Sequence, residues 1–243
     1  MDNMFKNKKI IIFDMDGTLI DSMGIWNEVD RRLIKQLGGD DTISEEEIQE
    51  QRDSNLRKFN QKPNPYVEYA GVLKEKYNVD KTPKEINEIR YGISQELLIN
   101  KVDYKPDAEF LIKKLKELNY IIGIASTTSR RSIDLYTNKN KNIINKASIN
   151  KYFDFIYTKD DVQNIKPNPE VYYKILEDYQ ASIDDCLIIE DSLIGVDTAY
   201  NIGIDCVALY DKYADNDRAQ INEKSKYQVN NFKGLLGYLE RII

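Results

Sequence analysis

Short, uninterrupted apolar runs recur along the chain, and each is followed by a stretch whose apolar residues have helical spacing. Runs this short and continuous are typical of strands that are buried on both faces of a sheet. The alternation of such strands with helices predicts an α/β fold, a doubly wound parallel sheet of the Rossmann-like kind with helices on both faces. The expected strands are Ile10–Phe13, Ile121–Ala125, Phe153–Tyr157, Leu187–Ile189 and Cys206–Leu209.

The helices of this predicted core are marked by stripes of apolar residues. Two of the stripes are made by Phe110, Leu111, Leu115 and Leu118, and by Val171, Ile175 and Leu176. The stretch 137–150 is polar and rich in Asn and Lys, and we expect it to form an exposed helix or loop.

Residues 21–102 break the alternation, because they show helical patterns without a strand pattern between them. The first pattern stops at two glycines, Ser44 with Glu47 resembles a capping box, and Pro83 stands near the start of the last pattern. The expected helices run from about 25 to 37, from 45, from 66 to 77 and from 83 to 99. We therefore predict an all-helical cap domain at 21–102, inserted after the first strand, and a core domain made of 1–20 and 103–243.

Composition narrows the possible functions. The chain has 243 residues and a formal net charge of −6, and no block of lysine and arginine stands out, so nucleic acid is not an expected partner. Its beginning does not resemble a signal peptide, and no apolar run is long enough to span a bilayer, so we expect a cytoplasmic protein without a membrane partner. We expect a monomer or weak dimer. The two cysteines lie in apolar runs, which favours buried, reduced residues.

The absence of histidine excludes whole classes of chemistry. The chain contains none, so Ser-His-Asp triads and histidine-ligated metals are ruled out. Any catalysis must use carboxylates, lysine, hydroxyls or backbone groups.

Polar residues follow four of the predicted strands at the point where each strand ends. In an open parallel sheet, ligands bind at the carboxyl ends of the strands, so these side chains are expected to converge at one edge. They are Asp14 and Asp16 after the first strand, Ser126, Thr127 and Thr128 after the second, Lys166 at some distance after the third, and Glu190 and Asp191 after the fourth. Each has a plainer interpretation by itself, since Ser-Thr-Thr is commonly an N-cap, acids suit helix N-termini, Asx-rich turns end strands and most lysines are solvated.

The charge of this group predicts a cation. Like-charged carboxylates a few ångströms apart repel one another by about 1 kcal/mol per pair in water and by more when buried. Because the candidate ligands are oxygen atoms and include neither His nor Cys, we expect Mg²⁺, which also accepts oxygens of a substrate phosphate.

Four motifs resemble those of the haloacid dehalogenase superfamily of phosphohydrolases. "FDMDGTLIDS" is similar to its first motif, Ser126 in "IASTT" to its second, Lys166 in "KPNPEVY" to its third and Glu190-Asp191 in "IIEDSLIGVDTA" to its fourth. The order and spacing of these motifs fit the family pattern across nearly the whole chain. The predicted helical insert after the first motif resembles the cap domain of the branch that includes β-phosphoglucomutase and phosphoglycolate phosphatase. The resemblance implies a phosphatase that acts on a small phosphorylated metabolite, such as a sugar phosphate.

The resemblance also implies roles for the motif residues. Asp14 would be the nucleophile that forms an aspartyl phosphate, and Asp16 the general acid and base. Asp14 and Asp191 would bind Mg²⁺ through their side chains, Asp16 through its carbonyl, and Glu190 nearby or through water. Ser126 and Lys166 would contact the phosphoryl group, and we expect Gly17, Thr18, Thr127 and Thr128 to contribute to substrate binding.

Two alternatives remain open beside the phosphatase. A phosphosugar mutase is disfavoured because β-phosphoglucomutases of this branch use a cap histidine and the motif here reads G-T-L-I-D. A catalytically idle binding protein is disfavoured because every motif residue is intact. In the cap, Trp26 and Glu28 are candidates to face the cleft, although Trp26 suits the cap core equally well. For the basic cluster Arg52, Arg57 and Lys58 we expect exposed surface charge.

Overall fold

A computed structural model describes residues 3–40 and 42–241. Its strands, all parallel, are β1 (Ile10–Phe13), β2 (Ile121–Ala125), β3 (Phe155–Tyr157), β4 (Cys186–Glu190), β5 (Asp205–Leu209) and β6 (Tyr227–Val229). The α-helices are α1 (Met23–Gln36), α2 (Glu45–Lys58), α3 (Pro65–Tyr77), α4 (Pro83–Asn100), α5 (Ala108–Glu117), α6 (Arg130–Asn138), α7 (Lys141–Ala147), α8 (Ile149–Tyr152), α9 (Glu170–Asp178), α10 (Leu193–Ile202), α11 (Arg218–Lys224) and α12 (Phe232–Leu239). The 3-10 helices are η1 (Lys159–Asp161), η2 (Ile183–Asp185) and η3 (Lys212–Asp217).

The six strands form one sheet in the order β3-β2-β1-β4-β5-β6. The order reverses at β1, which pairs with β2 on one side and with β4 on the other. Ile10 faces Ile121 in one neighbour and Cys186 in the other, so the three central strands begin level with one another. A doubly wound sheet places its ligand-binding crevice beside such a reversal point, at the carboxyl ends of the strands.

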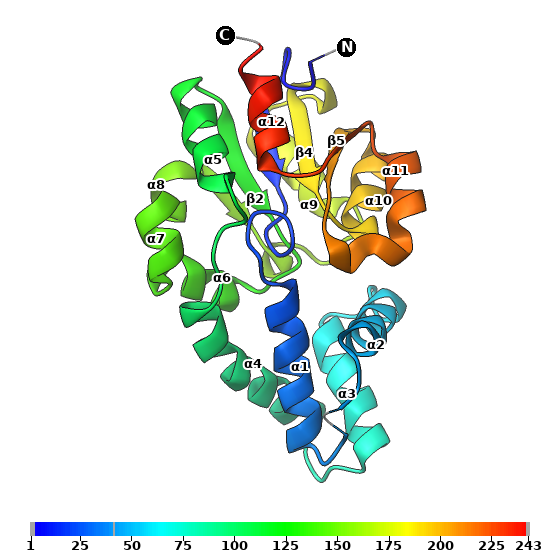
Figure 1. Cartoon of the computed structure of the whole chain (residues 1–243). Coiled ribbons are helices and arrows are strands. Elements are labelled where there is room, and N and C mark those ends of the chain that lie inside the picture. Colours follow the sequence, from blue (N-terminus) through cyan, green and yellow to red (C-terminus); the bar gives the residue numbers. More distant parts are fainter. Residues whose placement is uncertain (1–2, 41, 242–243) are drawn as a thin grey trace. The chain divides into compact units, whose positions relative to one another are not determined.

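Helices cover both faces of the sheet, as the continuous apolar strands require. Ile10 and Ile12 point to the face that α9 and α10 cover, where they join a buried cluster with Tyr172 and Val196. Figure 1 shows α5 and α12 in front of the opposite face. All four residues of β1 are buried, which explains why the run contains no polar residue.

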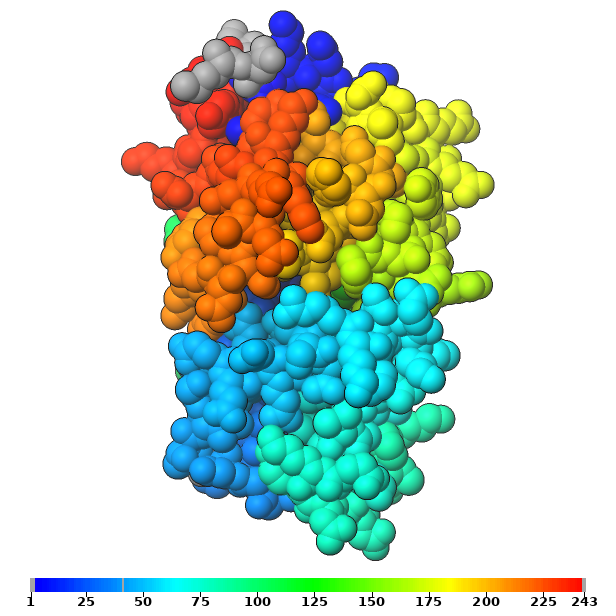
Figure 2. Space-filling model, turned by 90° about the vertical axis from the view of Figure 1, so that its right-hand side faces the viewer, coloured from blue at the N-terminus to red at the C-terminus, as the bar shows by residue number. Residues whose placement is uncertain are grey.

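The chain divides into two compact units, one made of 1–21 with 103–243 and the other of 22–102. The second unit consists of α1 to α4, whose side chains pack into one body, seen from one side in Figure 2. Local signals define its helices. The Ser44 hydroxyl accepts from the backbone N–H of Glu47, and Thr82 forms a full capping box with Glu85 before Pro83.

Some predicted elements differ from the structure. The stretch 137–150 contains the end of α6, all of α7 and the start of α8. It is not simply exposed, because Thr137, Asn140 and Ile143 are buried. Phe110, expected in an apolar stripe, is 55% exposed. Cys186 and Cys206 are buried free thiols, as predicted. Within the described residues, the helices are too short or too polar to cross a membrane.

Candidate active site

The sheet places the first and fourth motifs side by side. Asp14 directly follows β1, and its backbone N–H donates to the carbonyl of Ile189 in β4 at 3.0 Å. Glu190 ends β4 and Asp191 comes next, so their carboxylates emerge beside that of Asp14. Ser126 extends β2 in the same way, with its N–H on the carbonyl of Tyr157 at 2.9 Å. The parallel register therefore gathers residues that are far apart in the sequence.

Lys166 joins two of these carboxylates. Its Nζ lies 2.8 Å from Asp14 Oδ1 and 3.0 Å from Glu190 Oε1, and all three side chains are nearly inaccessible to solvent. Burial by itself lowers the pKa of Lys166, but Asp14 and Glu190 outweigh it and hold that pKa well above its ordinary value. The ammonium is thus a permanent positive charge at the end of β1.

One lysine does not balance the acids around it. Carboxylate oxygens of Asp14, Glu190 and Asp191 all lie within 4.8 Å of one another. Burial raises the pKa of Asp14 to about 7, although Lys166 lowers it and Glu190 adds to the increase. Burial, followed by the charges of Glu190 and Asp14, holds the pKa of Asp191 well above its usual range. Three buried carboxylates facing one ammonium suit a divalent cation with oxygen ligands such as Mg²⁺, so the residues fit the expected metal.

Glu190 is held from several directions. Its Oε2 accepts from the backbone N–H groups of Asp191 and Ser192 at 2.8 and 2.9 Å and from the Ser192 hydroxyl at 3.0 Å. Its other oxygen accepts from Lys166. This carboxylate acts as the link between the start of α10 and the lysine.

The loop after β1 requires a glycine. Gly17 has φ +88°, and a Cβ there would lie 2.5 Å from Asp191 Oδ2. The next residue, Thr18, is fully buried, and its hydroxyl donates to Asp191 Oδ1. Both were expected to contribute to substrate binding. The structure places both beside Asp191, where Gly17 leaves space for the carboxylate and the Thr18 hydroxyl donates to it.

The carboxylate of Asp16 is held by two hydroxyls. Thr128, expected at the substrate, donates its hydroxyl to Asp16 Oδ2. Tyr136 of α6 donates to Asp16 Oδ1 at 3.2 Å. Burial, together with the charge of Asp16, raises the pKa of Tyr136 well above its ordinary value, so the phenol keeps its proton. Sequence reasoning missed Tyr136, because its spacing from Ile133 marks an inward-facing helix position and says nothing of its hydroxyl.

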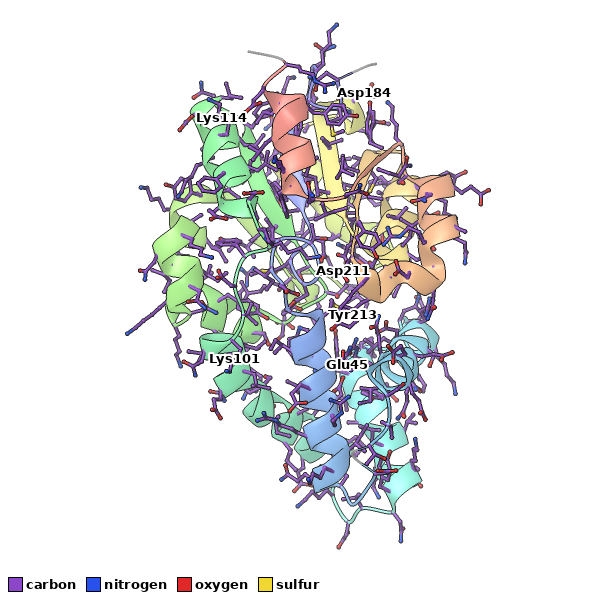
Figure 3. The ribbon with its side chains drawn as sticks, viewed as in Figure 1. Glu45, Lys101, Lys114, Asp184, Asp211 and Tyr213 are labelled. Atoms are coloured by element: carbon purple, nitrogen blue, oxygen red, sulfur yellow. The ribbon has the colours of Figure 1, made fainter. Side chains whose placement is uncertain are left out.

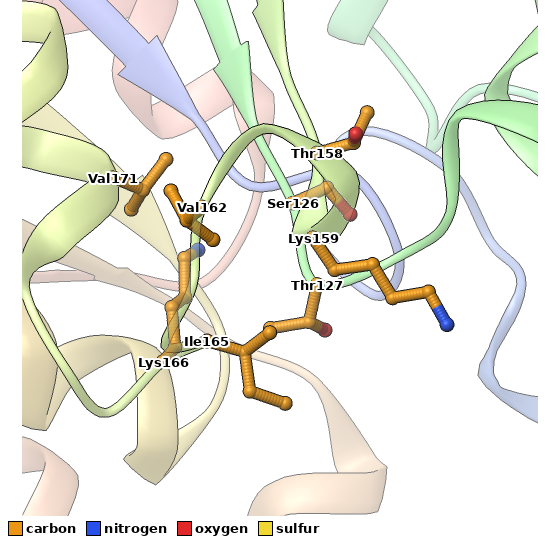
Figure 4. Close-up of a pocket in the computed structure, with 8 residues that line it drawn as sticks. All are labelled: Ser126, Thr127, Thr158, Lys159, Val162, Ile165, Lys166 and Val171. Atoms are coloured by element: carbon orange, nitrogen blue, oxygen red, sulfur yellow. The ribbon is translucent and has the colours of Figure 1, made fainter. Parts of the chain in front are cut away.

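A small open hollow lies beside Ser126 and Lys166. Figure 4 shows Ser126 and Thr127 on one side and the apolar side chains of Val162 and Ile165 on the other. The Ser126 hydroxyl accepts from the N–H of Thr128 at 3.1 Å. The second motif thus places a hydroxyl at the wall of a hollow that Lys166 also lines.

A further acid follows the neighbouring strand. Asp211 comes two residues after β5, is buried, and forms an ion pair with Lys105. Its Oδ1 accepts from the backbone N–H of Tyr213 at 2.8 Å, and both residues are labelled in Figure 3. Asp211 adds to the negative charge that raises the pKa of Asp191, though less than burial, Glu190 and Asp14 do.

The second unit, residues 22–102, is called the cap unit below. Within it, the expectation that Arg52 is an exposed surface charge was wrong. Arg57 and Lys58 are exposed as expected, but Arg52 is only 4% exposed and donates to Asp30 Oδ2 at 3.1 Å. The reason is that Asp30 lies on the buried side of α1 and needs a counter-charge. Arg90 of α4 donates to the other oxygen of Asp30 at 2.6 Å.

Trp26 and Glu28 of α1, the two candidates to face the cleft, each contact residues of the same unit. Trp26 is half-buried, and the guanidinium carbon of Arg90 lies 4.8 Å from the centroid of a ring of Trp26. Glu28 forms ion pairs with Arg31 and Arg32 on the same helix. These contacts lie within residues 22–102.

The similarity of this chain to known proteins shows its class. A model of the haloacid dehalogenase-like hydrolase family matches residues 11–209, most of the chain. The chain therefore belongs to this family, as its motifs indicated. Among curated proteins, it is similar to the phosphorylated carbohydrates phosphatase of Thermotoga maritima, with 27% identity over 80% of this chain and 82% of that protein.

Solved structures show the same fold. CbbY from Rhodobacter sphaeroides in complex with phosphate has a TM-score of 0.72 and 20% identity, over 93% of this chain and 95% of that one. A predicted phosphoglycolate phosphatase from Haemophilus somnus has a TM-score of 0.74 and 18% identity, over 96% and 98%. These similarities confirm the predicted fold class, a Rossmann-like core with an inserted helical domain.

Proposed function

We propose that this protein is a Mg²⁺-dependent phosphatase that hydrolyses a small phosphorylated metabolite, such as a sugar phosphate, through an aspartyl phosphate on Asp14. The observation that carries the proposal is the buried cluster in which Lys166 bridges Asp14 and Glu190, with Asp191 beside them. Family membership makes the protein a hydrolase, and the name of its Thermotoga maritima relative supports a phosphoric monoester hydrolase.

Asp14 is the nucleophile in this proposal. One of its carboxylate oxygens forms a bond to phosphorus while the bond from phosphorus to the ester oxygen breaks. Water then forms a bond to the same phosphorus while the bond to Asp14 breaks. Inorganic phosphate leaves and the carboxylate is restored. The contact with Lys166 orients Asp14 for the first of these steps.

Asp16 transfers the protons. It gives a proton to the departing ester oxygen in the first step, and it takes one from the attacking water in the second. One carboxyl group therefore serves both steps, and it ends in the protonation state in which it began.

Ser126 and Lys166 stabilise the transferring group. Because the Ser126 oxygen accepts from the N–H of Thr128, its own hydrogen is able to donate to a phosphoryl oxygen. Lys166 offsets the negative charge that gathers on the phosphoryl oxygens. Thr127 lines the same hollow and is the remaining hydroxyl proposed to contact substrate.

The proposed cofactor is Mg²⁺. The side chains of Asp14 and Asp191 and the carbonyl of Asp16 would hold it, with Glu190 nearby or through water. Bound there, the ion neutralises the clustered carboxylates and the phosphate of the substrate.

A phosphatase fits better than the two alternatives. The chain lacks histidine, whereas all its motif acids and the lysine are present, and Asp14, Glu190, Asp191 and Lys166 lie together. These observations favour hydrolysis over a mutase reaction and an enzyme over an idle binding protein.

Hydrolysis of p-nitrophenyl phosphate with and without Mg²⁺ tests the proposal. We expect turnover that EDTA suppresses and added Mg²⁺ restores. Asp14→Asn should abolish it, whereas Asp184→Asn, at an exposed acid outside the cluster, should leave it unchanged. Full turnover by the Asp14→Asn protein would contradict the assignment of the nucleophile. A panel of phosphorylated metabolites ranked by kcat/KM would then identify the substrate class.

A further inference from the structure

Tyr136 and Thr128 together hold the Asp16 carboxylate, one hydroxyl on each oxygen. The Tyr136 hydroxyl donates to Oδ1 at 3.2 Å, and the Thr128 hydroxyl donates to Oδ2. Thr128 stands in the loop after β2 and Tyr136 in α6, so the two donors belong to different elements. The carboxylate is unable to turn about its Cβ–Cγ bond without breaking a hydrogen bond.

We infer that Tyr136 is a positioning residue that, with Thr128, fixes the orientation in which Asp16 transfers protons. The inference rests on the proposed function, because the acid–base role of Asp16 belongs to that proposal. It adds a residue that lies outside the four motifs, in a helix that the motifs do not reach.

The environment of Tyr136 separates its hydroxyl from its ring. The side chain is fully buried, and Ile133, one turn earlier in α6, is buried as well. A phenylalanine would fill the same space, so packing alone does not require a tyrosine here. A buried hydroxyl does require a partner, and this one donates to the carboxylate of Asp16.

A hydroxyl donor on each oxygen is compatible with proton transfer by the Asp16 carboxyl group. Each carboxylate oxygen has two lone pairs, so an oxygen that accepts one hydrogen bond still has a position for a proton, a water molecule or a leaving group. Which of these positions faces the substrate is set by the rotation of the carboxylate. Without the Tyr136 hydroxyl, the carboxylate samples other rotations, and proton delivery becomes less efficient.

A pair of matched esters isolates this effect. p-Nitrophenol is a far stronger acid than phenol, so p-nitrophenyl phosphate needs little help from a general acid, whereas phenyl phosphate needs more. We expect Tyr136→Phe to lower kcat/KM for phenyl phosphate by about tenfold or more relative to p-nitrophenyl phosphate, since small misplacements of catalytic groups cost this much. An equal loss on both esters, or an unchanged ratio, would overturn the inference.

Control variants separate positioning from folding. Tyr104→Phe also removes a buried phenol hydroxyl of the core unit, which donates to the Ala147 carbonyl at 2.6 Å, and it should keep the wild-type ratio of the two rates. Thr128→Val removes the second donor to Asp16 and should shift the ratio in the same direction as Tyr136→Phe. Thr128→Ser keeps a hydroxyl and should restore the ratio. If Tyr136→Phe fails to fold, the comparison of the two Thr128 variants decides.

The wild-type protein separates the two proposals. If it hydrolyses neither ester in Mg²⁺, the proposed function fails and this inference fails with it. If it hydrolyses both esters and neither hydroxyl deletion changes their ratio, the inference alone is wrong.

Discussion

A Cβ at Gly195 would lie 1.6 Å from Oε1 of Glu190, so the first turn of α10 leaves the space that this carboxylate occupies. The same oxygen accepts from Lys166, which in turn contacts Asp14. Because residue 195 is a glycine, Glu190 has room to form the ion pair with Lys166 that orients the proposed nucleophile, Asp14.

Gly195→Ala should therefore damage catalysis without touching a charged residue. The methyl group displaces Glu190, and Lys166 loses one of its two carboxylate partners. We expect kcat/KM for p-nitrophenyl phosphate to fall by about 10². Gly92→Ala is the matched control, because a Cβ in the middle of α4 meets open space. It should leave kcat/KM unchanged and raise the free energy of unfolding by about 0.5–1 kcal/mol. Wild-type turnover by Gly195→Ala would contradict this account of Glu190.

Lys166→Met tests the ammonium separately from its stem. The variant keeps an unbranched side chain but leaves Asp14 and Glu190 buried without their shared cation. In EDTA, the free energy of unfolding should fall by about 3 kcal/mol, as for other broken buried ion pairs. Urea unfolding measures it. Lys114→Met removes a lysine whose partner Glu117 is exposed, and it should cost less than about 1 kcal/mol. Equal costs for the two variants would show that Lys166 does not stabilise the cluster.

Asp30→Asn tests the buried charge cluster of the cap unit. Asp30 is fully buried and accepts from both Arg52 and Arg90. Its neutral replacement removes the anion that Arg90 contacts and leaves Arg52 with its ion pair to Asp53. We expect the free energy of unfolding to fall by about 3–5 kcal/mol in urea. Glu28→Gln breaks the more exposed pairs of α1 and should change it by less than about 1 kcal/mol. A cost for Asp30→Asn no larger than that of Glu28→Gln would refute the role of Asp30.

Asp185 should contribute a pH-dependent part of the stability. The pKa of its carboxyl lies well below the ordinary value of 3.8, chiefly because Lys9 donates to it and then because Ser182 does. Since the folded chain holds the proton less tightly than the unfolded chain, the contribution is complete above pH 3.8 and disappears as the pH falls below it. The difference in Tm between the wild type and Asp185→Asn should therefore shrink as the pH is lowered through this range. A difference that stays constant would contradict the ion pair with Lys9.

Much of the fold was predictable because its signals are local. The apolar run Ile10–Phe13 predicts a strand that is buried on both faces. The capping residues Ser44 and Thr82, with Pro83, mark where two of the helices begin. The strand Tyr227–Val229 was missed, because it is short and lies at the edge of the sheet. Val229 is buried, but Tyr227 is half-exposed and Gln228 is exposed, so the strand has no continuous apolar run.

The candidate site was also predictable only in part. Strand ends are legible in the sequence, so the convergence of Asp14, Glu190 and Lys166 was predictable from strand order. Hydrogen bonds made by individual side-chain atoms are not predictable from the sequence. Whether the Thr128 hydroxyl faces substrate or Asp16 depends on side-chain rotation, and no spacing encodes it. Arg52 was placed on the surface because its buried partner, Asp30, is 22 positions away in another helix.

Direct detection of the aspartyl phosphate tests the central claim. The enzyme is mixed with p-nitrophenyl phosphate and Mg²⁺, stopped in acid within its first turnover, digested and examined by mass spectrometry. We predict a phosphoryl group on the peptide that carries Asp14, present in the wild type and absent from Asp14→Asn. Turnover without any phosphorylated Asp14 peptide, or a phosphoryl group found on another residue, would contradict the account.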